Sequence, residues 1–194
     1  MDYKSLKMRK VFFVLGLLAV VWSCGSSKKT VDSSMQSQAL NQMVEQKSFQ
    51  IVSEWAQPMN TNAMNSIASS GLLLPGNSGS NISLIANPNY LKMMADSVAA
   101  YLPYFGERQL SGGYGTENAI KFKGLPDKLE VSRNSKKETY SIGFTIKEKS
   151  EVYQVTVTLF NSLASHITIN SSQRNFIRYI GKVSELPKEK DGLQ

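Results

Sequence analysis

The sequence predicts a mainly β fold, in which a curled antiparallel sheet of about eight strands forms a sandwich or an open barrel, with one N-terminal helix packed on it. Apolar and polar residues alternate in four segments between residues 140 and 183, the pattern of strands with one buried and one solvated face. Short turns such as Asn161-Ser162 separate these segments, so the strands are expected to follow one another as a meander. An antiparallel sheet with this many strands curls or folds on itself. An α+β arrangement is the alternative.

A helix is expected to begin at Ser33, because Ser33 and Gln36 have the spacing of a capping box. The residues that follow form one apolar stripe at helical spacing: Ala39, Leu40, Met43 and Val44. Polar residues occupy the other positions, so we expect this helix to lie on the sheet as a lid.

The first strand is predicted from Phe49 to Trp55, and Pro58 ends it. Shorter strands are expected farther along the chain, near Ile82 and at 90–94, 98–102, 120–122 and 129–132. Residues 59–81 are rich in Asn, Ser and Gly and surround an apolar run at 72–74. A loop of this length is usually functional or disordered. Its composition favours disorder, so an irregular loop is predicted there.

Cys24 is the only cysteine of the chain, and it follows a basic start and a run of twelve mostly apolar residues, 11–22. This run is too short to cross a bilayer, which needs about 20 residues, and its flanks are those of a secretory signal peptide. Residues 21–24 (Val-Trp-Ser-Cys) resemble a bacterial lipobox, in which the cysteine is acylated and the leader is removed. The alternative is a buried structural thiol. The predicted organisation is a lipoprotein signal peptide at 1–23 with lipid attachment at Cys24, a flexible tether at 24–32, a single β-rich domain at 33–186 and a loose tail at 187–194.

The net charge of the whole chain is +7. The predicted leader holds four of the 22 basic and one of the 15 acidic residues, so the chain from Cys24 onward has a net charge of +4. Its lysines are spread along the sequence, and pairs such as Lys136-Lys137 are typical of solvated turns. We therefore expect no nucleic-acid partner. Weak attraction to acidic headgroups or lipopolysaccharide phosphates is the alternative.

The most distinctive block runs from Asp96 to Gly106 and is followed by Tyr114-Gly115 and by Ile-Lys-Phe at 120–122. Together with the segment Val-Glu-Gln-Lys-Ser-Phe at 44–49, this block resembles a family of uncharacterised bacterial lipoproteins catalogued as domain of unknown function 4251. The resemblance runs from the helix before Phe49 to the strand near Val183. It implies a location and an architecture, but no catalytic residue. No acidic run follows Cys24, and in lipoproteins of this kind that absence implies an outer-membrane anchor facing the periplasm.

Three aromatic residues in this block, Tyr101, Tyr104 and Phe105, have two interpretations. They can fill the end of a barrel or sandwich, which we favour, or form a platform for stacking sugar rings. Asp96-Ser97-Val98 resembles an acceptor motif for periplasmic O-glycosylation, with Ser97 as the acceptor. The alternative is an Asx-type turn at Asp96. The Gly-rich segment 111–115 lacks the lysine of a phosphate-binding loop and is interpreted as a hairpin turn.

The chain offers few groups for catalysis. His166 is the only histidine and is predicted on the solvated face of its strand, so neither a zinc site nor a Ser-His-Asp triad is expected, and no cofactor is predicted. A glycosidase needs only two carboxylates, and four glutamates are candidates for that pair: Glu54, Glu107, Glu117 and Glu130.

These observations leave three functional hypotheses. The favoured one is a non-enzymatic, membrane-anchored periplasmic lipoprotein whose domain binds an envelope protein or a glycan. The second is a hydrolase that acts on glycans or peptides with paired carboxylates. The third is a structural spacer in an envelope complex, which predicts an exposed apolar patch and no pocket.

Overall fold

The computed structural model describes residues 30–109 and 118–187. Cys24, the predicted leader, the Gly-rich segment 111–115 and nearly all of the predicted tail lie outside this range. The chain divides into two compact units, residues 1–34 and 35–194. The second unit holds the predicted β-rich domain.

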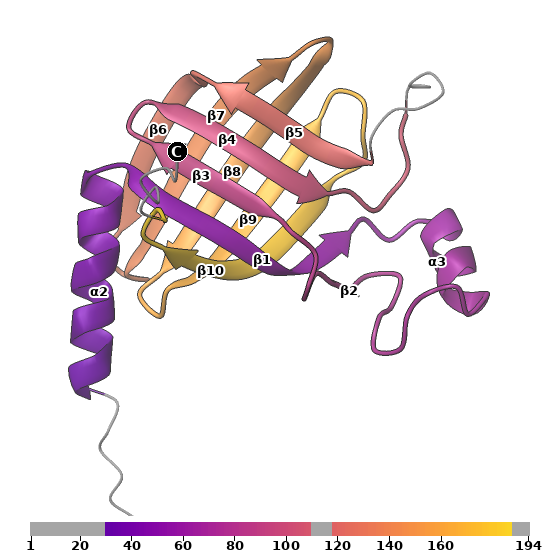
Figure 1. Cartoon of the computed structure of the whole chain (residues 1–194), viewed down its shortest axis with the longest axis horizontal. Helices are drawn as coiled ribbons and strands as arrows, with labels where there is room; N and C mark the ends of the chain where they lie inside the picture. Colours follow the sequence, from indigo (N-terminus) through magenta and orange to yellow (C-terminus); the bar gives the residue numbers. More distant parts are fainter. Residues whose placement is uncertain (1–29, 110–117, 188–194) are drawn as a thin grey trace, which may run out of the picture. The chain divides into compact units, whose positions relative to one another are not determined.

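The second unit contains ten strands and most of the two described helices (Figure 1). The helices are α2 (Thr30–Glu45) and α3 (Asn62–Ser69). The strands are β1 (Ser48–Pro58), β2 (Ile82–Ser83), β3 (Tyr90–Met94), β4 (Ser97–Pro103), β5 (Ala119–Gly124), β6 (Asp127–Asn134), β7 (Thr139–Glu148), β8 (Glu151–Phe160), β9 (Ala164–Ser171) and β10 (Ile177–Ser184).

All ten strands belong to one antiparallel sheet, in the order β5-β4-β3-β1-β10-β9-β8-β7-β6, with β2 paired to β1. The prediction of a mainly β fold with a curled antiparallel sheet is therefore confirmed. Two meanders, β3 to β5 and β6 to β10, are joined by β1, which lies between β3 and β10. The local sequence pattern predicts a single meander of about eight strands. The observed arrangement differs because β1 pairs with β3 and β10, which are far from it in the sequence.

The sheet forms a half-barrel whose two outermost strands are consecutive in the chain. Only Leu125 and Pro126 separate β5 from β6, which lie at opposite edges of the strand order. Gly124, which ends β5, has φ +148, a backbone conformation that favours glycine. The sheet must therefore curl until its edges approach each other at this corner, and β3 to β5 lie in front of β8 and β9 in Figure 1.

The core fills the space inside the curl. Phe122 of β5 contacts rings from the facing half of the sheet, with centroid distances of 6.1 Å to Phe144 and 5.6 Å to Tyr153. Alternate residues of β7 to β10 point inward and are buried, as the sequence periodicity predicts. The two halves of the sheet thus share one apolar interior.

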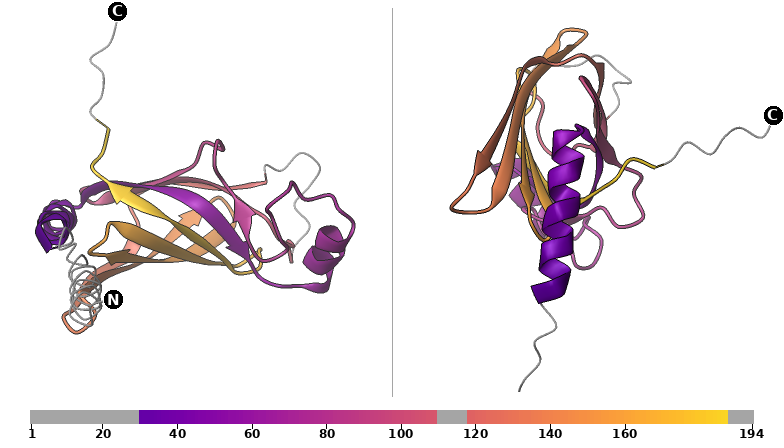
Figure 2. Two further views of the ribbon diagram at one scale, coloured as in Figure 1. Left: turned by 90° about the horizontal axis from the view of Figure 1, so that it is seen from below. Right: turned by 90° about the vertical axis from the view of Figure 1, so that its left-hand side faces the viewer.

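The end of the curled sheet where β1 begins is covered by residues 35–45 of α2 (Figure 2). Leu40, Met43 and Val44 are buried in the core, so the predicted apolar stripe does pack on the sheet. Asn41 accepts a hydrogen bond from the Tyr140 hydroxyl at 2.9 Å. The helix begins at Thr30, three residues before the predicted start at Ser33.

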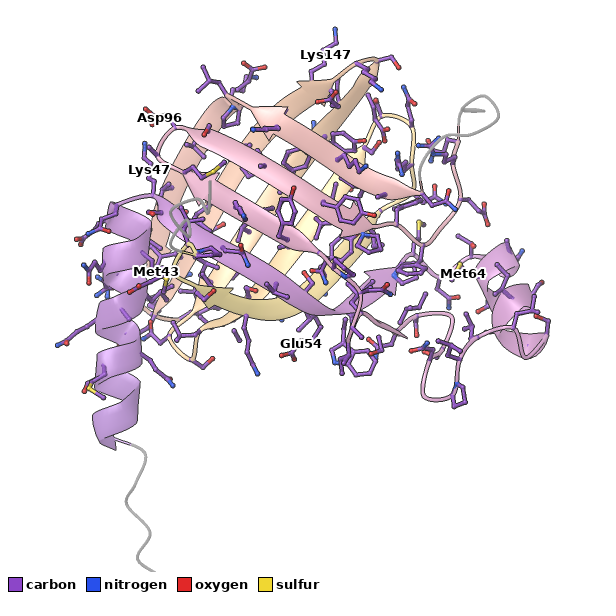
Figure 3. The ribbon with its side chains drawn as sticks, viewed as in Figure 1. Met43, Lys47, Glu54, Met64, Asp96 and Lys147 are labelled. Carbon is purple, nitrogen blue, oxygen red and sulfur yellow. The ribbon has the colours of Figure 1, made fainter. Side chains whose placement is uncertain are left out.

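The prediction of an irregular loop over residues 59–81 is wrong for its first half, which contains α3. The side chain of Thr61 caps this helix by accepting a hydrogen bond from the Met64 backbone amide at 3.2 Å. Met64, labelled in Figure 3, is buried, and Gly79 lies against the same turn of the helix. A helix of eight residues is stabilised by such contacts rather than by intrinsic helix propensity. Its sequence is rich in Asn and Ser, so the local composition does not predict a helix.

Gly181 allows β10 to pass close to the β1 backbone. A Cβ atom at residue 181 would lie 2.1 Å from the carbonyl oxygen of Val52 and 2.6 Å from the Cα of Ser53. The register between the two strands shifts just after this point, between Ser53 and Trp55. The atoms that a Cβ at residue 181 would contact all belong to the β1 backbone, so the backbone would have to move to make room for it.

We expect Gly181→Ala to lower the free energy of unfolding by about 2–3 kcal/mol, because overpacking here displaces backbone. Gly143→Ala on β7 is the matched control, since a Cβ there meets no atom within 4 Å. Denaturant unfolding of both variants measures the difference. Equal stability of the two variants would contradict this account of β1 and β10.

Candidate functional site

A surface hollow lies on the outer side of the sheet, at the hairpin that joins β6 and β7. Its volume is about 710 Å³, and it is open to solvent. Its lining consists of Ser132, Arg133, Asn134, Ser135, Lys136, Lys137, Thr139, Ser141, Thr158 and Phe160. Three of these side chains are cationic and none is a carboxylate. The lining therefore carries basic and polar groups, together with the aliphatic parts of its long side chains and the ring of Phe160.

The hairpin turn orders the backbone of two cationic residues at the rim. The Asn134 side-chain oxygen accepts hydrogen bonds from the backbone amides of Lys136 and Lys137, each at 3.1 Å. This Asx-type turn positions the backbone of both lysines. Arg133 lies with its guanidinium carbon 5.5 Å from the ring centroid of Tyr140, an arrangement that supports a cation-π contact.

Strand register builds the floor of the hollow. Ser141 lies opposite Ser132 on β6 and opposite Thr158 on β8, so three hydroxyl side chains form a row across the sheet. Phe160, beside this row, packs edge-on against His166 with ring centroids 4.9 Å apart. The floor therefore offers hydroxyl groups beside a half-buried aromatic ring.

Two other titratable groups lie beside the hollow. Glu138 lies in the hairpin turn, where its carboxylate accepts a hydrogen bond from Asn161 at 2.9 Å and is not part of the lining. Burial, assisted by the charge of Arg178, lowers the pKa of His166, so this imidazole is neutral at pH 7. The lining itself thus carries the positive charges of Arg133, Lys136 and Lys137, with the Glu138 carboxylate beside it.

A second polar cluster is buried at the opposite end of β8, inside the curl. Arg174 donates to Glu151 through Nε at 2.8 Å and through Nη2 at 3.3 Å. The side chains are 4% and 9% exposed, so this is a buried ion pair. Ser171 and Tyr153 also donate hydrogen bonds to Glu151. We call this group, together with Tyr104, which stacks on Arg174 at 5.1 Å, the Arg174 cluster.

The charge state of the Arg174 cluster follows from its contacts. Burial alone would raise the pKa of Glu151, but hydrogen bonds from Arg174, Ser171 and Tyr153 outweigh burial and hold that pKa below its usual value. Burial raises the pKa of Tyr153, and the adjacent Glu151 carboxylate adds to this effect. Burial likewise raises the pKa of Tyr104. At pH 7 the cluster therefore contains one carboxylate, one guanidinium and neutral phenols.

The three aromatic residues singled out in the sequence do not share one face. Tyr101 lies on the outer face, opposite Tyr90, with the Lys121 ammonium 5.0 Å from its ring centroid. Tyr104 is buried in the core and Phe105 packs against the core. Core filling, the favoured interpretation, thus describes the positions of Tyr104 and Phe105 but not that of Tyr101.

Ser97 begins β4 after a tight turn. Its hydroxyl donates a hydrogen bond to the Met94 carbonyl at 3.0 Å. The adjacent Asp96 is exposed and forms an ion pair with Lys47 at 3.1 Å, as Figure 3 shows. The Asp96 side chain is thus exposed to solvent in the turn, whereas the neighbouring Ser97 hydroxyl is half-buried.

The glutamates considered as a catalytic pair are dispersed, and Glu117 lies outside the described residues. Glu54 on β1 forms an ion pair with Lys182 at 3.1 Å. Glu130 lies on β6, with four strands between it and β1. Glu107 follows β4 at the end of the sheet. In the described ranges no three His, Cys, Asp or Glu side chains are grouped so that they could hold a metal ion.

Neither the hollow nor the Arg174 cluster is predicted by the sequence pattern. Lys136 and Lys137 were visible as a pair but resembled an ordinary solvated turn, and only the pairing of β6, β7 and β8 adds the hydroxyl floor. Glu151 and Arg174 are 23 residues apart and lie in segments without a motif. The one signal in the sequence was Glu151 itself, which occupies a buried position of β8 where the other buried positions hold apolar side chains.

The chain belongs to the family described as "Domain of unknown function (DUF4251)", whose model matches residues 32–183. A crystal structure of a DUF4251 family protein from Bacteroides eggerthii DSM 20697 is similar in fold, with a TM-score of 0.54 and 12% sequence identity. The similarity covers 78% of this chain and 89% of the other. A comparison with curated proteins finds no match. The family expected from the sequence is therefore confirmed.

Within residues 30–109 and 118–187, no helix has both the length and the apolar character needed to cross a membrane.

We expect Glu151→Leu to destabilise the protein by about 3–5 kcal/mol, because it leaves the Arg174 guanidinium buried without a counterion. The double variant Glu151→Leu/Arg174→Met should cost much less than the sum of the single changes. A double-mutant cycle by denaturant unfolding measures this coupling. Asp96→Ala, which breaks an exposed ion pair, is the control, with an expected cost of about 0–1 kcal/mol.

The buried pair also sets a pH dependence. Because the pKa of Glu151 is lowered by folding, its stabilising contribution is present above the unfolded value of about 4.3 and is lost as the pH falls through the folded value. Between about pH 5 and pH 3 the double variant should lose less stability than the wild type. Parallel losses in this range would show that Glu151 is not a source of the acid sensitivity.

Proposed function

We propose that this protein is a non-enzymatic lipoprotein, anchored by acylated Cys24 in the outer membrane and facing the periplasm, whose domain binds an anionic glycan in the hollow at the β6–β7 hairpin. One observation supports the ligand class above all. Lys136 and Lys137 lie in the lining of the hollow, which includes a third basic residue, Arg133, and no carboxylate.

The composition of the hollow suits a charged sugar better than an apolar molecule. Small-molecule pockets are mostly apolar and enclosed, whereas this hollow is open to solvent and every lining residue except Phe160 carries a polar or charged group. The row formed by Ser132, Ser141 and Thr158 can exchange hydrogen bonds with sugar hydroxyls, and the Phe160 ring can support a sugar face. Arg133 and the two lysines can pair with carboxylate or phosphate substituents.

Binding is favoured over hydrolysis because the hollow lacks the groups that hydrolysis needs. A glycosidase requires two carboxylates that flank the scissile bond. The lining supplies none, and Glu54 and Glu130 lie on strands that are far apart in the sheet.

The proposed anchor rests on the sequence. The lone cysteine at residue 24 ends the segment that resembles a lipobox, and the following residues, Gly25 to Lys29, have the small and polar composition of a tether. Two acyl signals are enough for stable membrane attachment. The proposed O-glycosylation at Ser97 would add a glycan at the turn between β3 and β4.

The intact mass of the full chain extracted from its native membranes tests the anchor. We expect a chain that begins at Cys24 and carries two or three acyl groups, and Cys24→Ala should remain unprocessed. Any further mass that disappears in Ser97→Ala identifies the glycan. An unmodified chain beginning at Met1 or Met8 would overturn the lipoprotein assignment.

Binding of polygalacturonate, a polymer of uronic acid, to the detergent-extracted full chain tests the hollow. We expect Lys136→Glu/Lys137→Glu to weaken binding by at least about tenfold, equivalent to about 1.4 kcal/mol, because attraction becomes repulsion. Raising the salt concentration should weaken the wild-type interaction as well.

The matched control is Lys147→Glu/Lys149→Glu, which makes the same change in net charge at the opposite end of β7; Lys147 is labelled in Figure 3. Neutral dextran serves as the uncharged probe. If both double variants lose affinity equally, the interaction reflects net charge alone and the hollow is not the site.

A further inference from the structure

The Arg174 cluster closes the end of the curled sheet opposite α2. Its residues come from the start of β8, from the connection between β9 and β10, and from the segment after β4. In that segment Arg108 lies directly opposite Arg174 in an isolated antiparallel bridge. Backbone hydrogen bonds on either side hold the two segments together: Asn175 donates to Glu107 at 3.1 Å, and Gln109 donates to Gln173 at 2.8 Å. Two arginines are thus fixed at this end of the core.

Arg174 has donor capacity that its protein neighbours do not use. Its Nε and Nη2 atoms donate to Glu151, but Nη1 is buried and has no acceptor among the described residues. The residue as a whole is 5% exposed, so bulk water does not solvate this nitrogen freely. An unpaired buried donor destabilises the folded protein, and a charged one is an exception to the rule that buried polar groups are paired.

The hydroxyl groups nearby are already donating elsewhere. Tyr104 donates to the Glu107 and Asn175 carbonyls at 2.9 and 3.1 Å. Tyr179 donates to the Pro103 carbonyl at 2.9 Å, and Tyr153 donates to Glu151. None of these hydroxyl oxygens accepts a hydrogen bond from Arg174 Nη1, which has no acceptor among the described residues. A ligand that fits must bring an acceptor.

The charges around Arg174 indicate what net charge a ligand with such an acceptor should carry. Glu151 contributes one negative charge, while Arg174 and Arg108 contribute two positive charges, and the tyrosines are neutral at pH 7. Arg108 is near enough to affect both Tyr104 and Tyr153 electrostatically. A monoanion would bring the net charge of this group to zero. A dianion would leave an excess negative charge beside Glu151, which is costly in a buried setting.

We propose that Arg174 and Arg108 together bind the carboxylate of a small ligand at this end of the sheet. Arg174 Nη1 supplies a buried hydrogen bond, and Arg108, which is half-buried, supplies the second cation at the rim. A planar carboxylate matches the planar guanidinium. This site is separate from the hollow at the β6–β7 hairpin, so either proposal can fail without the other.

The test uses the detergent-extracted full chain and follows the guanidinium nitrogen resonances of Arg174 by NMR, with acetate and inorganic phosphate as probes. We expect acetate to shift the Arg174 Nη signals saturably, with millimolar affinity of about −4 kcal/mol at most for so small a ligand. Inorganic phosphate, largely a dianion above neutral pH, should produce no saturable shift.

Arg108→Gln is the informative variant, because it removes the rim cation and leaves the buried pair intact. It should weaken acetate binding by at least about threefold, whereas Arg178→Gln, an exposed arginine on β10, should leave it unchanged. Arg174→Lys tests the buried donor, with thermal unfolding as the check that the variant folds.

Three results would overturn the proposal: no saturable shift up to about 100 mM acetate, equal affinity in Arg108→Gln and Arg178→Gln, or tighter binding of phosphate than of acetate. The first would assign the Arg174 cluster a purely structural role. The third would assign it to phosphate-bearing ligands instead.

Discussion

The connection between β5 and β6 is two residues long, although these strands are the opposite edges of the sheet. Such a short link can be accommodated only if the sheet curls until its edges approach each other. The curl brings β5 over β7 and β8, so that Phe122 contacts Phe144 and Tyr153 and one apolar interior serves both halves. The outer hollow and the buried Arg174 cluster both occupy positions that this curl defines.

The two ends of the curled sheet are closed by different physical means. Residues 35–45 of α2 cover one end with Leu40, Met43 and Val44, which stabilise it through apolar burial. The other end depends on the Glu151–Arg174 ion pair and its hydroxyl donors. A buried ion pair contributes little net stability, because the cost of desolvation offsets the attraction between the charges. Apolar side chains could close this end of the sheet at a lower desolvation cost than the Glu151–Arg174 ion pair. The presence of the ion pair is therefore the reason to look for a ligand at this end.

The two proposed sites use opposite sides of one sheet. Alternate residues of β7 and β8 face inward and outward, so the strands that bury Tyr153 also present Ser141 and Thr158 to solvent. The outer hollow is open and lined by basic and hydroxyl side chains, which suits a large anionic glycan. The inner group is buried and carries one excess positive charge, which suits one small carboxylate. A tethered domain with both would bind two classes of ligand without catalysing a reaction.

The sequence by itself determined the fold class, the strands from β7 to β10, the packing face of α2 and the family, because periodic burial and the family's motifs are local signals. It did not determine the insertion of β1 between β3 and β10, the helix at 62–69 or the closeness of Glu151 to Arg174. Strand pairing between distant segments and the contacts of a short helix depend on partners that no local pattern specifies. For the same reason Lys136 and Lys137 were visible as a basic pair, while the hydroxyl floor beside them arose only when three strands came together.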